Sequence, residues 1–281
     1  MDQYGVVGHP VAHSWSPFIH GMFARQTAQA LTYRLFDVLP EQFNERVLAF
    51  ASQGGLGLNV TVPHKLAAAA LAEDSSERAR RAGAVNTLSF ENGRILGDNT
   101  DGAGLVRDLT QNLGLTVARR RVLIAGAGGA VRGVIAPLLE LDPVELVIAS
   151  RTADRAAALV TDFADLGAVR ACGLAELSLG SFDLVINATS ASLSGEVPAI
   201  PADAISASTT CYDMAYARTD TPFVRWARER GCARAVAGWG MLVEQAAESF
   251  EIWRGVRPDT ATVLSVLTNP DRDALTTHGA V

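Results

Sequence analysis

Apolar and polar residues alternate between strand-like and helix-like spacing over the first hundred positions of the chain. Apolar runs and period-two patterns predict strands, and apolar residues three or four positions apart predict helices. The spacing predicts strands at residues 4–8, 32–38 and 57–62, and helices at residues 18–30, 41–53 and 77–82. Pro63 favours the first turn of a further helix that runs to residue 72. Asn92 and Gly93 separate two short strands, at residues 86–90 and 94–97, which is typical of a hairpin.

A more regular alternation follows a helix that the pattern predicts from Asp101 to about residue 113. Further strands are predicted at residues 121–125, 144–150, 183–187, 209–213 and 233–237. Further helices are predicted from the first of these strands to residue 141 and at residues 153–166 and 238–253. One more helix follows and runs to about residue 267. Strands that alternate with helices in this way build a parallel sheet.

The segment RVLIAGAGGAVRG at residues 121–133 joins an apolar strand to a helix through a glycine-rich turn. Such a turn leaves backbone N–H groups exposed at the positive end of the helix dipole, where a pyrophosphate binds. We therefore expect five consecutive residues to hold the diphosphate of a dinucleotide: Gly126, Ala127, Gly128, Gly129 and Ala130. A glycine-rich turn that serves packing alone is the alternative, because one such loop is weak evidence.

The next strand, VELVIAS at residues 144–150, strengthens the dinucleotide interpretation. An NAD enzyme places an acidic residue at the end of this strand to bind the ribose, and none stands here. Ser150 is followed instead by Arg151 and Thr152, with Arg155 one turn on. Two guanidinium groups and a hydroxyl suit a 2′-phosphate, so the sequence predicts NADP as the cofactor.

These patterns predict an α/β protein with two domains. Residues 1–101 form an N-terminal α/β domain that binds the substrate, completed by returning C-terminal helices at residues 239–268. Residues 102–238 form a Rossmann-type domain that binds NADP. Residues 269–281 are polar and contain proline, which favours a flexible tail.

Composition narrows the class of protein further. The 281 residues are 48% hydrophobic and 19% charged, with a net charge of −6, which argues against a nucleic-acid binder. Three scattered cysteines, Cys172, Cys211 and Cys232, read as buried thiols of a reducing compartment. The chain opens without a basic segment followed by an apolar run, and no run reaches membrane-spanning length. We expect a cytoplasmic protein without membrane partners.

Polar residues of the N-terminal half gather where predicted strands end. Their hydroxyl, amide, ammonium and carboxylate groups suit a small polyhydroxylated acid: Ser14, Ser16, Thr61, Lys65, Asn86 and Asp101. Lys65 can donate or accept a proton at a carbonyl or alcohol, and Asp101 can hold its ammonium group. The alternatives are a surface lysine and an aspartate that only caps a helix. Four of the five histidines (His9, His13, His20 and His64) match no metal-ligand spacing, so no metal is expected.

The chain resembles shikimate dehydrogenase over nearly its whole length. The segments that carry the resemblance are GHPVAHSWSP, NVTVPHK, AGAVNT, GDNTDG, GAGGAVRG, SRTADR, NATS, CYDMAY and GWGMLVEQA, in this order. The resemblance implies reversible reduction of 3-dehydroshikimate to shikimate with NADPH, in the route to aromatic amino acids. It implies Lys65 and Asp101 as the catalytic pair. It also implies further substrate residues, Tyr216 and Gln245, and further cofactor residues, Glu77, Met214 and Gly238.

Two alternatives differ in function. A quinate/shikimate dehydrogenase would accept a broader range of substrates or cofactors, although Arg151 and Arg155 disfavour NAD. A nucleotide sensor that has lost catalysis would not need both Lys65 and Asp101. The sequence leaves a monomer and a homodimer equally open.

Overall fold

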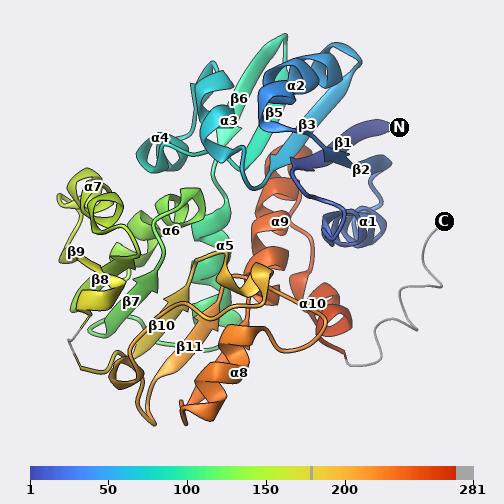
Figure 1. Cartoon of the computed structure of the whole chain (residues 1–281). Helices are drawn as coiled ribbons and strands as arrows, with labels where there is room; N and C mark the ends of the chain where they lie inside the picture. Colours follow the sequence, from blue (N-terminus) through green and yellow to red (C-terminus); the bar gives the residue numbers. More distant parts are fainter. Residues whose placement is uncertain (178–179, 270–281) are drawn as a thin grey trace. The chain divides into compact units, whose positions relative to one another are not determined.

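The computed structural model describes residues 1–177 and 180–269. The chain divides into two compact units, Met1–Gly104 with the described residues from Leu242 onward, and Leu105–Met241. It passes from one unit to the other within helix α5 (Asp101–Arg107) and again within helix α9 (Trp239–Arg254) (Figure 1). The predicted tail lies outside the described residues except for Asn269.

The first unit is built on a six-stranded mixed sheet of order β2-β1-β3-β5-β6-β4. Its strands are β1 (Asp2–Gly8), β2 (Leu31–Asp37), β3 (Gly55–Val60), β4 (Asp74–Ser75), β5 (Thr87–Glu91) and β6 (Arg94–Asp98). Strand β1 pairs in parallel with β2 and β3, whereas β5 runs antiparallel to both β3 and β6. The hairpin predicted around Asn92 and Gly93 is therefore present, and both residues have positive φ.

Helices cover the two faces of this sheet with different side chains. The helices of the unit are α1 (Ser16–Gln26), α2 (Phe43–Ser52), α3 (Lys65–Leu71), α4 (Glu77–Ala82) and α10 (Thr260–Thr268), together with most of α9. Val7, Leu58 and Val60 point to one face and pack with buried residues of α2, α3 and α4. On the other face, Tyr4 of β1 stacks at 4.8 Å on Trp253 of α9. The period-two alternation of the strands thus gives each face its own core.

The second unit holds a six-stranded, wholly parallel sheet of order β12-β11-β10-β7-β8-β9. Its strands are β7 (Arg121–Ala125), β8 (Glu145–Ser150), β9 (Val169–Gly173), β10 (Leu184–Asn187), β11 (Thr210–Asp213) and β12 (Arg234–Ala237). Its helices are α6 (Gly129–Leu139), α7 (Ala153–Phe163) and α8 (Pro222–Glu229). Counted from β7, the strands run 3-2-1-4-5-6, which is the doubly wound order of dinucleotide-binding folds.

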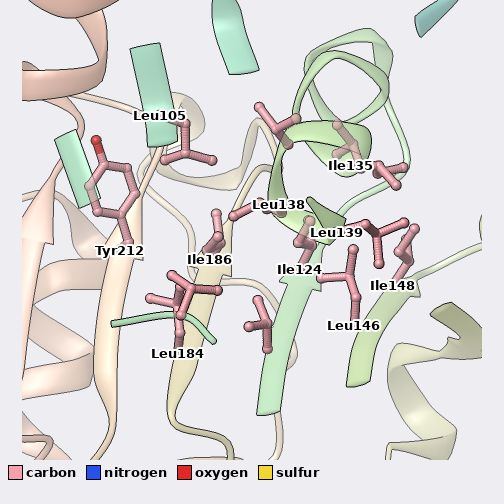
Figure 2. Packing of buried hydrophobic residues seen from close by; sticks show 14 of the residues in the cluster. Leu105, Ile124, Ile135, Leu138, Leu139, Leu146, Ile148, Leu184, Ile186 and Tyr212 are labelled. Atoms are coloured by element: carbon pink, nitrogen blue, oxygen red, sulfur yellow. The ribbon is translucent and has the colours of Figure 1, made fainter. Parts of the chain in front are cut away.

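Both faces of the parallel sheet are buried, as its nearly continuous apolar strands require. Ile124, Ile148 and Ile186 project from neighbouring strands into one core, where they meet Leu138 and Leu139 of α6 (Figure 2). Residues one position away, such as Leu123, Val147 and Val185, enter a second core on the opposite face. The α/β fold with a Rossmann-type domain is confirmed; the assignment of substrate and cofactor to the two domain ranges stays a prediction.

Three predicted helices differ from the observed ones. Pro63 does not open a helix: it lies in a turn where the His64 N–H donates to Thr61 O at 2.9 Å, and α3 begins at Lys65. The helix predicted from Asp101 to residue 113 is α-helical only as far as Arg107, and the chain then forms a π-helical turn, Asp108–Asn112. There the buried Asp108 carboxylate accepts a hydrogen bond from the Tyr212 hydroxyl at 2.6 Å. The helix predicted at residues 18–30 begins earlier, at Ser16, and ends at Gln26, before a positive φ at Ala28.

Three elements were not predicted from the pattern. Strand β4 has two residues and β9 is an edge strand, so neither carries a run of buried apolar residues. Helix α8 did have a sequence signal, which is Thr221 followed by Pro222. In the structure Thr221 caps the helix by accepting a hydrogen bond from the Val224 N–H, and Pro222 occupies the first turn.

An arginine of α4 joins two carboxylates that are far apart in sequence. Arg78 Nε donates to Asp98 Oδ1 at 2.7 Å, and its Nη1 donates to Glu248 Oε1 at 2.8 Å. Burial favours the neutral form of both carboxyl groups, but the hydrogen bonds outweigh it and the pKa of Asp98 and that of Glu248 lie below their ordinary values. These charges therefore stabilise the fold above the carboxyl pKa of the unfolded chain, and the stabilisation is lost as pH falls through the folded pKa.

We expect Arg78→Met to lower the free energy of unfolding by about 2 kcal/mol at pH 7, since each of two partly buried carboxylates loses a charged donor, although Asp98 keeps Ser76 and Glu248 keeps Arg257. The difference from wild type should shrink as the pH falls below about 4, the ordinary carboxyl pKa, and vanish once the pH lies below the lowered pKa values of the folded protein. Urea unfolding at several pH values measures this. Arg94→Met is the matched control, because Arg94 is exposed and lies 3.7 Å from Asp74; it should change stability by less than about 0.5 kcal/mol. Equal losses in the two variants would contradict the role given to Arg78.

Candidate functional site

Lys65 and Asp101 form an ion pair in the first unit. Lys65 opens α3 after the turn that follows β3, and Asp101 opens α5 after the loop that follows β6. Lys65 Nζ donates a hydrogen bond to Asp101 Oδ2, and the side chains keep 12% and 6% of their surface exposed. Lys65 is also the only lysine in the sequence. The two residues predicted as a catalytic pair thus lie in contact and almost out of solvent.

Asn86, immediately before β5, fixes the other oxygen of the carboxylate. Its Nδ2 donates to Asp101 Oδ1 at 2.9 Å and to Thr100 Oγ1 at 2.9 Å. Its Oδ1 accepts the backbone N–H of Thr100 at 2.8 Å. A backbone N–H can only donate, so the amide has one possible orientation, with its NH₂ group toward Asp101. Both carboxylate oxygens of Asp101 are therefore held by donors.

Gln245 of α9 reaches the same group of side chains. Its Oε1 lies 3.3 Å from Asn86 Nδ2, and its Nε2 donates to Leu242 O at 2.8 Å. The approach depends on Gly104 of α5, because a Cβ there would lie 2.7 Å from the Cβ of Gln245. Any larger residue at position 104 would push α5 and α9 apart and move Gln245 away from Asn86.

Of the predicted serines, Ser14 lies in the loop between β1 and α1, and Ser16 is the first residue of α1. Ser14 Oγ accepts the Ser16 N–H at 3.2 Å, and the two hydroxyl groups are 3.1 Å apart. Thr61 follows β3, and its N–H donates to Val7 O at 2.9 Å. Within the described residues, none of these three side chains hydrogen-bonds to Lys65 or Asp101. Their hydroxyl groups therefore remain available to another partner.

His64, the neighbour of Lys65 in sequence, faces the core. Its ring stacks on Phe43 with centroids 4.7 Å apart, and its Nε2 donates to Val38 O at 2.8 Å. Burial lowers the pKa of His64, and the bond to Val38 offsets only part of the effect. A neutral ring that packs is the consequence.

The glycine-rich turn of the second unit forms a cradle at the start of α6. Gly126 has a φ of +127°, and a Cβ there would lie 2.9 Å from Ala188 O, so only glycine fits. Gly128 is exposed, with open space where its Cβ would be, and it precedes the first helical residue, Gly129. The turn thus presents backbone to solvent at the N-terminus of an 11-residue helix. These features fit the diphosphate of a dinucleotide.

The residues predicted to bind the 2′-phosphate lie at the end of β8 and the start of α7. Ser150 is buried and its Oγ accepts the Thr152 N–H at 3.3 Å. Arg151, Thr152 and Arg155 are exposed. In the part of the chain that the structure describes, neither arginine pairs with an acidic side chain. Two guanidinium groups without a counter-charge beside a helix N-terminus fit an anionic ligand.

The remaining predicted residues belong to the strand ends of the second unit and to α4. Met214 follows β11 and Gly238 follows β12; the Gly238 N–H donates to Ala215 O at 2.9 Å. Tyr216 packs on Trp239 with ring centroids 4.8 Å apart. Glu77 is exposed in the first turn of α4. Tyr216, predicted to bind substrate, is thus in the second unit, and Glu77, predicted to bind cofactor, is in the first.

The sequence did not single out the buried polar residues behind Asn86. Asn59, Thr87, Thr100 and Ser249 are at most 6% exposed and hydrogen-bond to one another. A polar residue inside the strand GLNV was one available signal, because a buried amide requires partners. The position of Ser249, one turn after Gln245, was another.

Two further observations limit the chemistry. Among residues 1–177 and 180–269, no three histidine, cysteine or acidic side chains are placed to hold a metal ion, and no helix is long and apolar enough to cross a membrane.

The prediction of three buried thiols is wrong in two cases. Cys211 is buried, but Cys172 lies on the edge strand β9 and Cys232 follows α8, so both are partly exposed.

Three family models match the chain. The shikimate dehydrogenase substrate binding domain matches residues 6–88, shikimate / quinate 5-dehydrogenase matches residues 108–204, and the shikimate 5′-dehydrogenase C-terminal domain matches residues 238–268. A relative from Alkalilimnicola ehrlichii, named shikimate dehydrogenase (NADP(+)), is 58% identical over 95% of this chain and 98% of its own.

Solved structures agree with the sequence matches. An Ael1 enzyme from Pseudomonas putida is 49% identical, with a TM-score of 0.89 over 96% of this chain and 99% of that one. Shikimate 5-dehydrogenase from Thermus thermophilus, solved in complex with NADP(H) and shikimate, is 31% identical. Its TM-score is 0.84 over 95% of this chain and 98% of that one.

Proposed function

The chain belongs to the shikimate dehydrogenase family, and from this premise we propose how its own residues carry the reaction. The enzyme reversibly reduces 3-dehydroshikimate to shikimate with NADPH, a step of aromatic amino acid biosynthesis. The observation that carries the assignment of roles is the buried contact between Lys65 and Asp101, with Asn86 beside it.

Lys65 is the proton donor. When the ketone carbon of the substrate accepts hydride, negative charge develops on its oxygen, and the ammonium group gives that oxygen a proton. In the reverse direction the neutral amine takes the proton from the hydroxyl. NADPH, when bound, supplies the hydride. Reduction adds one hydride and one proton to the substrate ketone, and oxidation removes one of each from the alcohol.

Asp101 and Asn86 position the Lys65 ammonium group relative to the substrate. The carboxylate keeps the Lys65 ammonium in place, and it can accept a hydrogen bond from a neighbouring hydroxyl of the substrate. Asn86 prevents the carboxylate from rotating. Gln245 adds an amide to the same group, and we assign it to a ring hydroxyl.

The hydroxyl groups of Ser14 and Ser16 bind the substrate carboxylate, with Thr61 and Tyr216 as further substrate contacts. A pair of adjacent hydroxyl donors suits the two oxygens of a carboxylate. The support is their position at the start of α1, with Ser14 just before the helix and Ser16 at its first residue, and the 3.1 Å between their hydroxyl groups.

The cofactor is held in the second unit. The turn from Gly126 to Ala130 receives the diphosphate, and Ser150, Arg151, Thr152 and Arg155 receive the 2′-phosphate. Met214 and Gly238 are assigned to the nicotinamide half, and Glu77 is retained as a cofactor contact. We also propose a cytoplasmic protein that works as a monomer or homodimer.

An absorbance assay at the nicotinamide band tests the function with four pairs: shikimate or quinate, each with NADP or NAD. We expect the highest kcat/KM for shikimate with NADP. Faster turnover of quinate would assign the chain to quinate/shikimate dehydrogenases of broader use. Tight NADP binding without turnover of either substrate would indicate a sensor.

A further inference from the structure

Three buried hydroxyl groups meet behind Asn86 in the first unit. We call them the hydroxyl cluster: Thr87 of β5, Thr100 of the loop before α5, and Ser249 of α9. Ser249 Oγ lies 2.8 Å from Thr87 Oγ1 and 3.2 Å from Thr100 Oγ1. Their exposed fractions are 1%, 0% and 0%. Hydroxyl groups this deeply buried must satisfy their donors and acceptors within the protein.

Two of the three hydroxyl groups contact the Asn86 amide. Thr87 Oγ1 donates to Asn86 Oδ1 at 2.9 Å, and Thr100 Oγ1 accepts from Asn86 Nδ2 at 2.9 Å. Thr100 must then donate its own proton elsewhere. Ser249 Oγ and Asn86 Oδ1 both lie 3.2 Å from Thr100 Oγ1, and Gln245 Oε1 lies at 3.5 Å. Ser249 therefore offers the Thr100 proton an acceptor outside the Asn86 amide.

Ser249 also has partners outside the cluster. Its Oγ donates to the backbone oxygen of Gln245 at 3.0 Å and accepts from Asn59 Nδ2 at 2.9 Å. The Asn59 amide is itself oriented by Tyr33, whose hydroxyl donates to Asn59 Oδ1 at 2.7 Å. A single serine thus connects α9 to β3, β5 and the loop before α5.

We propose that Ser249 is a positioning residue for the reaction. The Thr100 N–H sets the orientation of the Asn86 amide; through the hydroxyl cluster Ser249 holds that amide in position against Asp101, and through its bond to Gln245 it keeps α9 in position beside the amide. Without its oxygen, the Thr100 proton turns to Asn86 Oδ1, which lies 3.2 Å away, or to Gln245. The Thr100 hydroxyl then holds the amide less firmly. This inference rests on the proposed function, because Asn86 and Gln245 are the residues that it serves.

Ser249→Ala tests the proposal. We expect kcat/KM for shikimate to fall about tenfold, since the loss of one oriented hydrogen bond within a buried network costs about that factor. The decisive comparison uses the background of Asn86→Ala, where Ser249→Ala should lower kcat/KM by less than about twofold. Equal tenfold losses in both backgrounds would show that Ser249 acts independently of Asn86 and would overturn the proposal.

Two further variants separate hydrogen bonding from packing. Ser249→Cys keeps the volume but provides a weak donor and acceptor, so its activity should resemble that of Ser249→Ala; wild-type activity would mean that only volume counts. Ser265→Ala, at an exposed position of α10, is the control and should leave kcat/KM unchanged.

If Ser249→Ala does not fold, Thr87→Val removes a neighbouring hydroxyl of the cluster at nearly constant shape, and the same coupling to Asn86 is expected. A different result would overturn the role of the cluster. Failure of the proposed function is visible separately, because wild-type protein and the Ser265→Ala control would then also lack shikimate activity.

Discussion

We expect Lys65→Met to lower kcat for shikimate oxidation about a thousandfold and to change KM by less than about threefold. Methionine keeps the length of the side chain but cannot give or take a proton, and positioned acid–base groups contribute between about a hundredfold and ten-thousandfold. The ammonium group interacts chiefly with charge that develops in the transition state, so kcat falls and KM does not. Steady-state kinetics with NADP at saturation measures both constants.

No other lysine is present that could replace Lys65 as proton donor in a variant. Lys65→Arg keeps the positive charge, and with it the partner of Asp101, but a guanidinium group stays protonated and cannot exchange its proton. We expect this variant to be as slow as Lys65→Met. A turnover within about tenfold of wild type in both variants would remove Lys65 from the chemistry.

We expect replacement of both Arg151 and Arg155 with alanine to raise KM for NADP about a hundredfold and to leave KM for NAD nearly unchanged. Each arginine contributes a charge-assisted hydrogen bond of about 1.5 kcal/mol to the 2′-phosphate, and NAD has no such group. The preference for NADP over NAD therefore falls by the same factor. Kinetics with each cofactor at low ionic strength gives the ratio.

Arg225→Ala is the control, because it removes one positive charge from the same unit at a position outside the proposed 2′-phosphate site. Arg225 is exposed on α8 of the same unit and donates to Asp220 O at 2.7 Å. It should leave the cofactor preference unchanged. If the double variant raised the two KM values equally, the arginines would be acting on a part of the cofactor that NAD and NADP share.

The sequence predicted the interior of the fold better than its edges. Strands such as β7 and β8 are recognisable because a parallel strand buried on both faces must be apolar throughout. Edge strand β9 has solvent on one side and loses that signal. The π-helical turn after α5 depends on the contact between Asp108 and Tyr212, which are 104 positions apart. Local periodicity cannot report a contact of that range.

The residues of the candidate site also differ in how far the sequence predicts them. Residues in short motifs, such as Lys65 or Gly126, were predictable because their neighbours in sequence build the turn that presents them. Ser249 and Asn59 were not, since their role comes from partners on other elements. A buried polar residue in a strand or helix indicates that such partners exist, but only the structure identifies them.

The lysine side chain can be observed directly. Protein grown with lysine ¹³C-labelled at Cε alone gives one lysine Cε signal in solution NMR, because Lys65 is the only lysine. We expect the signal to shift in Asp101→Asn, and to shift in wild type when shikimate is added to saturation. Asp74→Asn, which changes an exposed carboxylate on β4, should leave it in place. A signal that responds neither to Asp101→Asn nor to shikimate would contradict the assignment of Lys65 and Asp101 as the catalytic pair.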